Sequence, residues 1–165
     1  MPDVGMAQFQ MDRQRRVLLA CEKWWPLVGP NTLQNRSDCS GFVISVAGEL
    51  GILLNGNANA IYYAIQLSPW TRLGVGDFAA NLAAAAATNG SFVVGAWRNS
   101  AGGNGHVAVI VDTNHSSANV PFRSRAIAYW GTLGAEGKKY ERHSLSWGDT
   151  KRPQVLYASR GINLM

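Results

Sequence analysis

Cys39 is the residue whose position suggests chemistry most directly. It stands in the run Asp-Cys-Ser-Gly-Phe-Val at 38–43. If Asp38 is the N-cap of a helix, Cys39 is its first residue and lies beside backbone N–H groups that have no partner within the helix. Such a terminus favours the thiolate, which is the nucleophilic form of cysteine. The backbone N–H groups of Cys39 and Ser40 are then the predicted donors to the oxyanion of a tetrahedral intermediate.

A cysteine nucleophile needs a base within hydrogen-bond reach, and the chain has three histidines. His106 follows the run Gly-Gly-Asn-Gly and opens the apolar stretch 107–111, so a rigid strand can aim it at a helix terminus. His115 and His143 stand in segments that are expected to lie at the surface. His106 is therefore the predicted base.

The group that orients the imidazole is less clear. Asp112 lies about 20 Å further along the same strand, by the rise of a β-strand, so it cannot reach His106. The next predicted strand, 126–130, offers a backbone carbonyl or the tip of Tyr129 or Trp130. A backbone carbonyl is preferred there, with Trp130 as the candidate orienter. The substrate-lining candidates, which flank the two motifs, are Asp38, Ser40, Asn57, Asn59 and Asn104.

Other chemistries have less support. Two cysteines and three dispersed histidines lack the spacing of a zinc site, so no metal and no other cofactor is expected. The Gly-Gly-Asn-Gly run precedes a strand rather than a helix and lacks the lysine of a phosphate-binding loop. Cys21 falls among the apolar positions of a predicted helix, which suggests a buried free thiol.

The composition fits one folded domain. The 165 residues are 47% hydrophobic, which suits a single domain over 1–165, and residues 1–10 are expected to be loose. The net charge of +5 comes from scattered basic residues without a nucleic-acid motif, so no nucleic acid partner is expected. Residues 1–10 lack the features of a signal peptide, and no apolar run is long enough for membrane insertion.

The periodicity of apolar residues changes along the chain. Helical spacing covers 12–25, 38–50, 57–67 and 77 to about 89. Strand-like runs follow at 92–97, 106–112, 126–130 and 155–158, with another near 140–145. This order predicts an α+β fold in which N-terminal helices pack on an antiparallel β-sheet.

The two motifs also carry a family resemblance. Asp-Cys-Ser-Gly-Phe-Val at 38–43 and Gly-His-Val-Ala-Val-Ile at 105–110 resemble the NlpC/P60 cysteine peptidases of bacterial cell walls. The segment 39–60 resembles more closely the first family of type VI secretion amidase effectors, and the surroundings of Cys21 and Gly131 fit that family too. The resemblance implies the papain-like NlpC/P60 fold, with Cys39 and His106 as the catalytic pair. A relative has a cysteine near the position of Trp130, and its absence here leaves the third catalytic role open.

The resemblance also implies an activity and a setting. It implies an antibacterial toxin that cleaves the peptidoglycan stem peptide between D-glutamate and meso-diaminopimelate. Such a protein is made in the cytoplasm without a signal peptide, is exported by the type VI secretion apparatus and acts in the periplasm of target Gram-negative cells. A cognate immunity protein is the expected partner, and a monomer is the expected state.

Two further readings of the same residues stay open. An acyl transferase could use the same Cys–His framework, because both reactions pass through a thioester. A catalytically idle module could keep the fold and bind cell wall, although the presence of both Cys39 and His106 argues against it.

Overall fold

One antiparallel sheet organises the molecule. The computed structural model describes residues 3–114, 121 and 125–163. Within them a six-stranded sheet has the order β1-β6-β2-β3-β4-β5, and every neighbouring pair is antiparallel. The strands are β1 (Thr71–Val75), β2 (Phe92–Trp97), β3 (His106–Thr113), β4 (Ala126–Trp130), β5 (Lys138–Arg142) and β6 (Leu156–Arg160).

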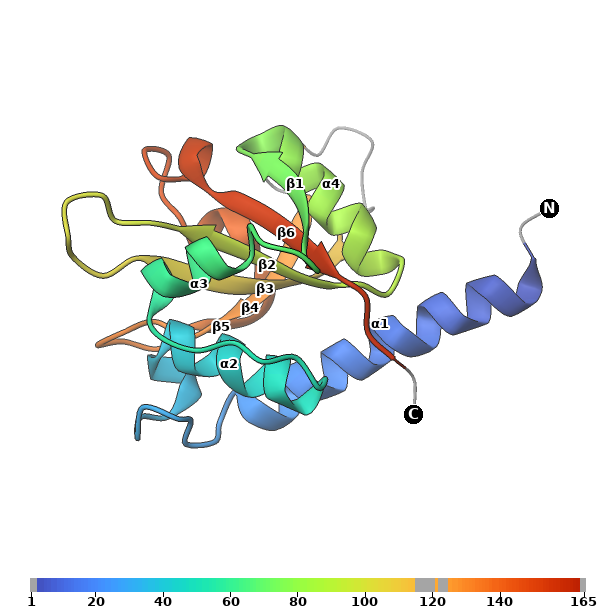
Figure 1. Cartoon of the computed structure of the whole chain (residues 1–165), viewed down its shortest axis with the longest axis horizontal. Coiled ribbons are helices and arrows are strands. Elements are labelled where there is room, and N and C mark those ends of the chain that lie inside the picture. The colour runs from blue at the N-terminus through green and yellow to red at the C-terminus, as the bar shows by residue number, and fades with distance from the viewer. Residues whose placement is uncertain (1–2, 115–120, 122–124, 164–165) are drawn as a thin grey trace.

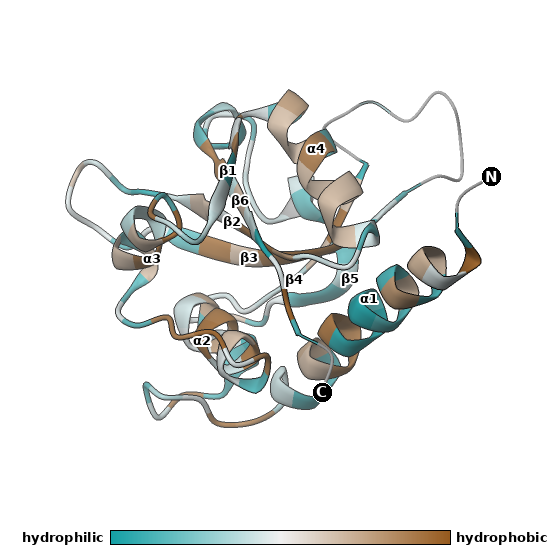
Figure 2. Cartoon of the chain, turned by 45° about the vertical axis from the view of Figure 1, so that its right-hand side comes forward, coloured by the Kyte–Doolittle hydropathy of each residue, from teal (hydrophilic) through white to brown (hydrophobic). Residues whose placement is uncertain are grey.

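Helices cover both faces of this sheet (Figure 1). The helices are α1 (Val4–Trp24), α2 (Cys39–Glu49), α3 (Ala58–Ala64) and α4 (Asp77–Thr88). The first three share a core with one face, whereas the alanine-rich α4 packs on the other (Figure 2). Successive side chains of a strand point to opposite faces, so Val94 of β2 faces the first core and Val93 faces α4.

The predicted α+β class is confirmed, with differences at particular elements. The helices predicted at 38–50 and from 77 are α2 and α4, and the predicted helix at 57–67 is the shorter α3. The strand predicted near 140–145 is β5, and it gives way to the 3-10 turn η3 (His143–Leu145). Two further 3-10 turns are η1 (Asn35–Ser37) and η4 (Arg152–Gln154). The pattern of the sequence does not predict β1, an edge strand between α3 and α4 that pairs with β6.

The expectation that residues 1–10 are loose is wrong for the described part of that segment. Helix α1 starts at Val4, where the Asp3 side chain accepts a hydrogen bond from the Gly5 N–H. Its first turns project beyond the body of the protein (Figure 1), and its buried residues lie later, at Val17, Ala20 and Cys21. No helix among the described residues combines the length and the apolar character needed to cross a bilayer.

Candidate active site

Cys39 begins α2, as the sequence predicts. The side chain of the preceding residue, Asp38, does not form the hydrogen bond to the described residues of the helix that is usual for an N-cap residue. Asp38 occupies the N-cap position with an extended backbone (φ −148°, ψ 103°). Its carboxylate accepts hydrogen bonds from Asn31 Nδ2 at 2.9 Å and from Ser40 Oγ at 3.2 Å. Within the described chain, that side chain caps no N–H group of the helix. The first N–H groups of α2 are therefore left for the sulfur and for an oxyanion.

His106 begins β3, opposite Trp97 of β2. The residue before it must be glycine, because a Cβ at Gly105 would lie 2.5 Å from the Trp97 carbonyl oxygen and 2.6 Å from Asn59 Oδ1. β3 also packs against α2. The close approach at Gly105 thus holds the start of β3 against the end of β2 and the start of α3.

Cys39 and His106 line the same pocket, which has a volume of about 300 Å³. Trp130, the candidate orienter, lines it as well, so the structure brings together the three residues predicted for the centre of the site. The full lining is Cys39, Gly105, His106, Trp130, Thr132, Leu133, Ser146, Trp147 and Lys151.

The Cys39 thiol is held neutral by its surroundings. Burial is the main cause that raises its pKa, and the charge of Asp38 raises it further. Hydrogen bonds from the backbone N–H groups of Val107, Ser40 and Cys39 act in the opposite direction, but the net shift is upward. The helix start therefore does not produce a resting thiolate, contrary to what the sequence suggests. A base must remove the proton as the sulfur attacks.

His106 is prepared to act as that base. Burial lowers its pKa to about 4, and the positive charge of Lys151 contributes in the same direction. The imidazole is therefore neutral at pH 7 and can accept a proton. The thiol and the imidazole are thus both neutral at rest and do not form a thiolate–imidazolium ion pair. In this arrangement the imidazole can act as a general base toward the thiol.

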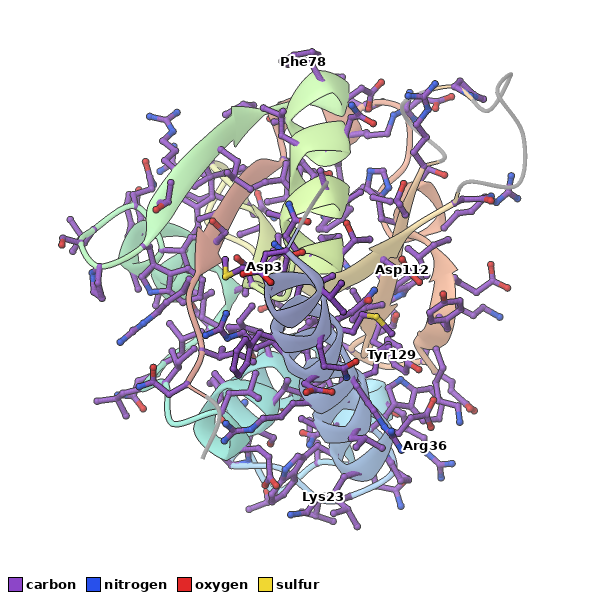
Figure 3. All side chains as sticks on the ribbon, turned by 90° about the vertical axis from the view of Figure 1, so that its right-hand side faces the viewer. Asp3, Lys23, Arg36, Phe78, Asp112 and Tyr129 are labelled. Carbon is purple, nitrogen blue, oxygen red and sulfur yellow. The ribbon has the colours of Figure 1, made fainter. Side chains whose placement is uncertain are left out.

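The two residues considered as orienters are engaged elsewhere. The Trp130 carbonyl accepts a hydrogen bond from Trp25 Nε1 at 3.1 Å. Tyr129 points toward α1 (Figure 3), where its hydroxyl donates to Glu22 at 2.6 Å. Asp112, at the far end of β3, accepts from the Tyr140 hydroxyl.

The partner of His106 comes from a segment in which the sequence predicts no site residue. Nε2 of His106 lies 2.5 Å from Oγ of Ser146, which directly follows η3. The ring of Trp147 meets the imidazole edge to face at a centroid distance of 5.4 Å. Lys151 Nζ lies 4.5 Å from the centroid of the Trp97 ring, beside the site. Neither motif nor periodicity marks this segment, so only its place in the fold reveals it.

The asparagines proposed to line the substrate do not line the pocket. Asn57 caps α3 by accepting a hydrogen bond from the Ala60 N–H at 3.0 Å. Asn59 accepts from the Asn99 N–H and donates to the Gly103 carbonyl, and the Asn104 carbonyl accepts from Asn99 Nδ2. These residues fasten α3 to the loop that leads into β3. Asp38 and Ser40 bond to each other behind the nucleophile rather than lining the pocket.

Three other residues were considered for chemistry: His143, Cys21 and His115. His143, expected at the surface, is fully buried, and its Nδ1 contacts the Ala126 carbonyl at 3.3 Å. Cys21 is a buried free thiol, as predicted. His115 lies outside the described residues. In the described part of the chain no three His, Cys, Asp or Glu side chains gather as metal ligands would.

One pocket of this α+β fold holds a buried cysteine at the start of a helix and a neutral histidine at the start of a strand. This arrangement is typical of one class of protein, the thiol-dependent acyl-transfer enzymes. Comparison with known proteins narrows this class. No family model matches the chain. Over 146 residues the chain is 32% identical to the peptidoglycan amidase Tse1 of Pseudomonas aeruginosa, and the alignment covers 86% of each protein. The chain therefore belongs to the same amidase family, as the resemblance of its two motifs indicated.

Proposed function

We propose that the chain is a cysteine amidase of peptidoglycan that cleaves the stem peptide at the D-glutamyl–meso-diaminopimelate bond. The observation that carries the proposal is the pocket shared by Cys39 and His106, in a chain that belongs to an amidase family. The proposal includes export by a type VI secretion apparatus, action in the periplasm of target Gram-negative cells, and a cognate immunity protein that closes the pocket in the producing cell.

The proposed reaction has two halves. Cys39 Sγ attacks the carbonyl carbon while its proton passes to His106, and the carbonyl electrons move to an oxygen held by the N–H groups of Cys39 and Ser40. The C–N bond then breaks, and His106 returns the proton to the leaving amine. In the second half His106 takes a proton from water as the water oxygen attacks the carbonyl carbon of the thioester. The C–S bond then breaks, and His106 returns the proton to the sulfur of Cys39, which restores the thiol.

The positive charge of Lys151 at the pocket suits this substrate. The stem peptide carries carboxylates on both sides of the proposed bond, and Lys151 shares the pocket with the nucleophile. A cation there attracts an anionic substrate and also keeps His106 unprotonated.

The test is product analysis with Gram-negative peptidoglycan and mass spectrometry. Wild-type protein should release fragments with a new carboxyl on D-glutamate and a new amine on diaminopimelate. Cys39→Ala should release none, whereas the matched variant Cys21→Ala should keep the activity. Binding without new fragments would favour an idle module, and fragments capped by an added amine would favour an acyl transferase.

A further inference from the structure

The contact between His106 and Ser146 has a direct bearing on how the base works. An imidazole has two ring nitrogens, and in the neutral form only one of them carries a proton. Nε2 of His106 lies 2.5 Å from Ser146 Oγ, so Nδ1 is the nitrogen that remains for the proton of Cys39. For Nδ1 to accept a proton, the ring hydrogen must be on Nε2.

We propose that Ser146 is the positioning residue of His106: its Oγ accepts the hydrogen of Nε2 and thereby presents the Nδ1 lone pair to Cys39. The proposal rests on the proposed role of His106 as base. It gives Ser146 the place that a carboxylate or an amide holds beside other catalytic histidines. The contact joins β3 to the turn after η3, at a separation of 40 residues in the chain.

A positioning residue must itself be fixed, and the surroundings of Ser146 meet this requirement. Its backbone N–H donates to the His143 carbonyl at 2.8 Å, and His143 is fully buried. On its other side Trp147 is also buried and contacts the rings of His106, His143 and Tyr157. The backbone of Ser146 is thus anchored on both sides by a buried aromatic residue, which limits the freedom of its side chain.

A hydroxyl suits the charge of this site better than a carboxylate would. A carboxylate beside the imidazole would raise its pKa and favour a resting ion pair with the thiol. Ser146 is neutral, and the charge that acts on the pKa of His106 is the cation of Lys151, which lowers it. The low pKa of His106 agrees with this arrangement, in which the imidazole stays neutral until the thiol transfers its proton.

The first test reads the tautomer of His106 and needs no enzyme activity. Nitrogen-15 NMR of histidine-labelled Cys39→Ala protein, with His106 assigned by comparison with His106→Gln, reports which ring nitrogen carries the hydrogen. The Nε2–H form is expected, with a mixture of tautomers after the further change Ser146→Ala. An Nδ1–H form with Ser146 present, or no change in Ser146→Ala, would overturn the proposal.

The second test is kinetic, on the full chain with peptidoglycan fragments. Ser146→Ala should lower kcat about 10- to 100-fold with little change in KM, because substrate contacts remain while proton transfer is impaired. Ser146→Thr keeps the hydroxyl and should restore most of kcat. The matched control Ser144→Ala, in the same turn, should behave as wild type.

The two tests separate the two proposals. Wild-type kcat in a folded Ser146→Ala protein would overturn the role of Ser146 while leaving the amidase intact. If the wild-type protein released no fragments, the proposed function would fail, and the tautomer of His106 would still decide whether Ser146 positions it.

Discussion

Two of the walls of the pocket are built in different ways. The motif wall, made of Cys39, Gly105 and His106, comes from the start of a helix and the start of a strand. The loop wall, made of Ser146, Trp147 and Lys151, comes from the connection between β5 and β6. The motif wall supplies the proposed nucleophile and the proposed base, and its geometry is fixed by the backbone. The loop wall supplies the hydroxyl and the positive charge that act on these groups, and buried aromatic rings fix it.

The largest expected effect of a single substitution lies in the motif wall. Cys39→Ser replaces the thiol by a hydroxyl of much higher pKa in a buried site, so the nucleophile is lost. Activity on peptidoglycan should fall by about 10⁴-fold or more, with an unchanged far-UV circular dichroism spectrum. Retention of more than a hundredth of the activity would contradict the role of the motif wall.

Acid should lower the stability through two buried histidines, His106 of the motif wall and His143, which lies in the same β5–β6 connection as the loop wall. The pKa of His106 and that of His143 are each lowered to about 4, mainly by burial. Between the ordinary histidine pKa of about 6.5 and pH 4 the unfolded chain binds protons that the folded chain does not, so stability decreases as the pH falls through this window. The loss is on the order of 3 kcal/mol for each histidine, measurable by urea unfolding at several pH values.

One substitution separates the contributions of the two histidines to that loss. His143→Phe fills an aromatic site, and His143 Nε2 has no hydrogen-bond partner among the described residues. The variant should remove about half of the acid loss and leave the rest to His106. Amidase activity should fall below about pH 4, as His106 takes a proton. An acid limb near pH 6.5 would mean that His106 is solvated instead.

Substitution of a glycine should destabilise the protein more near the motif wall than near the loop wall. Gly131 lies where the end of β4 meets the turn before α2, and a Cβ there would lie 2.0 Å from the Asn35 carbonyl oxygen and 2.7 Å from that of Asp38. Gly131→Ala should therefore cost about 2–3 kcal/mol and displace the start of α2. Gly148→Ala, beside the loop wall, meets no described atom within 4 Å and should change stability by less than about 0.5 kcal/mol. The stabilities of the two variants can be compared with that of the wild type by thermal unfolding.

The smallest expected effect concerns the charge of the loop wall. Lys151→Met removes the cation but keeps the length of the side chain, so KM for stem-peptide fragments should rise about 5- to 10-fold, equivalent to about 1 kcal/mol. The difference between wild type and variant should shrink in high salt. Lys138→Met, an exposed position in β5, is the control and should leave KM unchanged. Equal KM in the two variants would remove Lys151 from substrate binding.

Sequence and structure agree best where the pattern is local. The start of α2 was predictable because a polar N-cap, small residues and then apolar residues follow one another within 38–46. β3 was predictable from its continuous apolar run after Gly105. The edge strand β1 was not, because it pairs with β6, more than 80 residues later in the chain by the register Thr71↔Ser159. An exposed strand of that kind has little apolar pattern of its own.

The sequence by itself determined the family and the two residues proposed to react, because each motif depends on neighbours within a few residues. Only the tertiary structure decided the protonation states and the partner of the base. Cys39 and His106 are buried by elements that come from distant parts of the chain. This burial lowers the pKa of His106 and raises that of Cys39, so that the thiol is favoured over the thiolate that a helix start alone would favour. Ser146 reaches His106 only because Trp147 and His143 are buried against β4 and β6. Contacts of that range leave no local pattern in a single sequence.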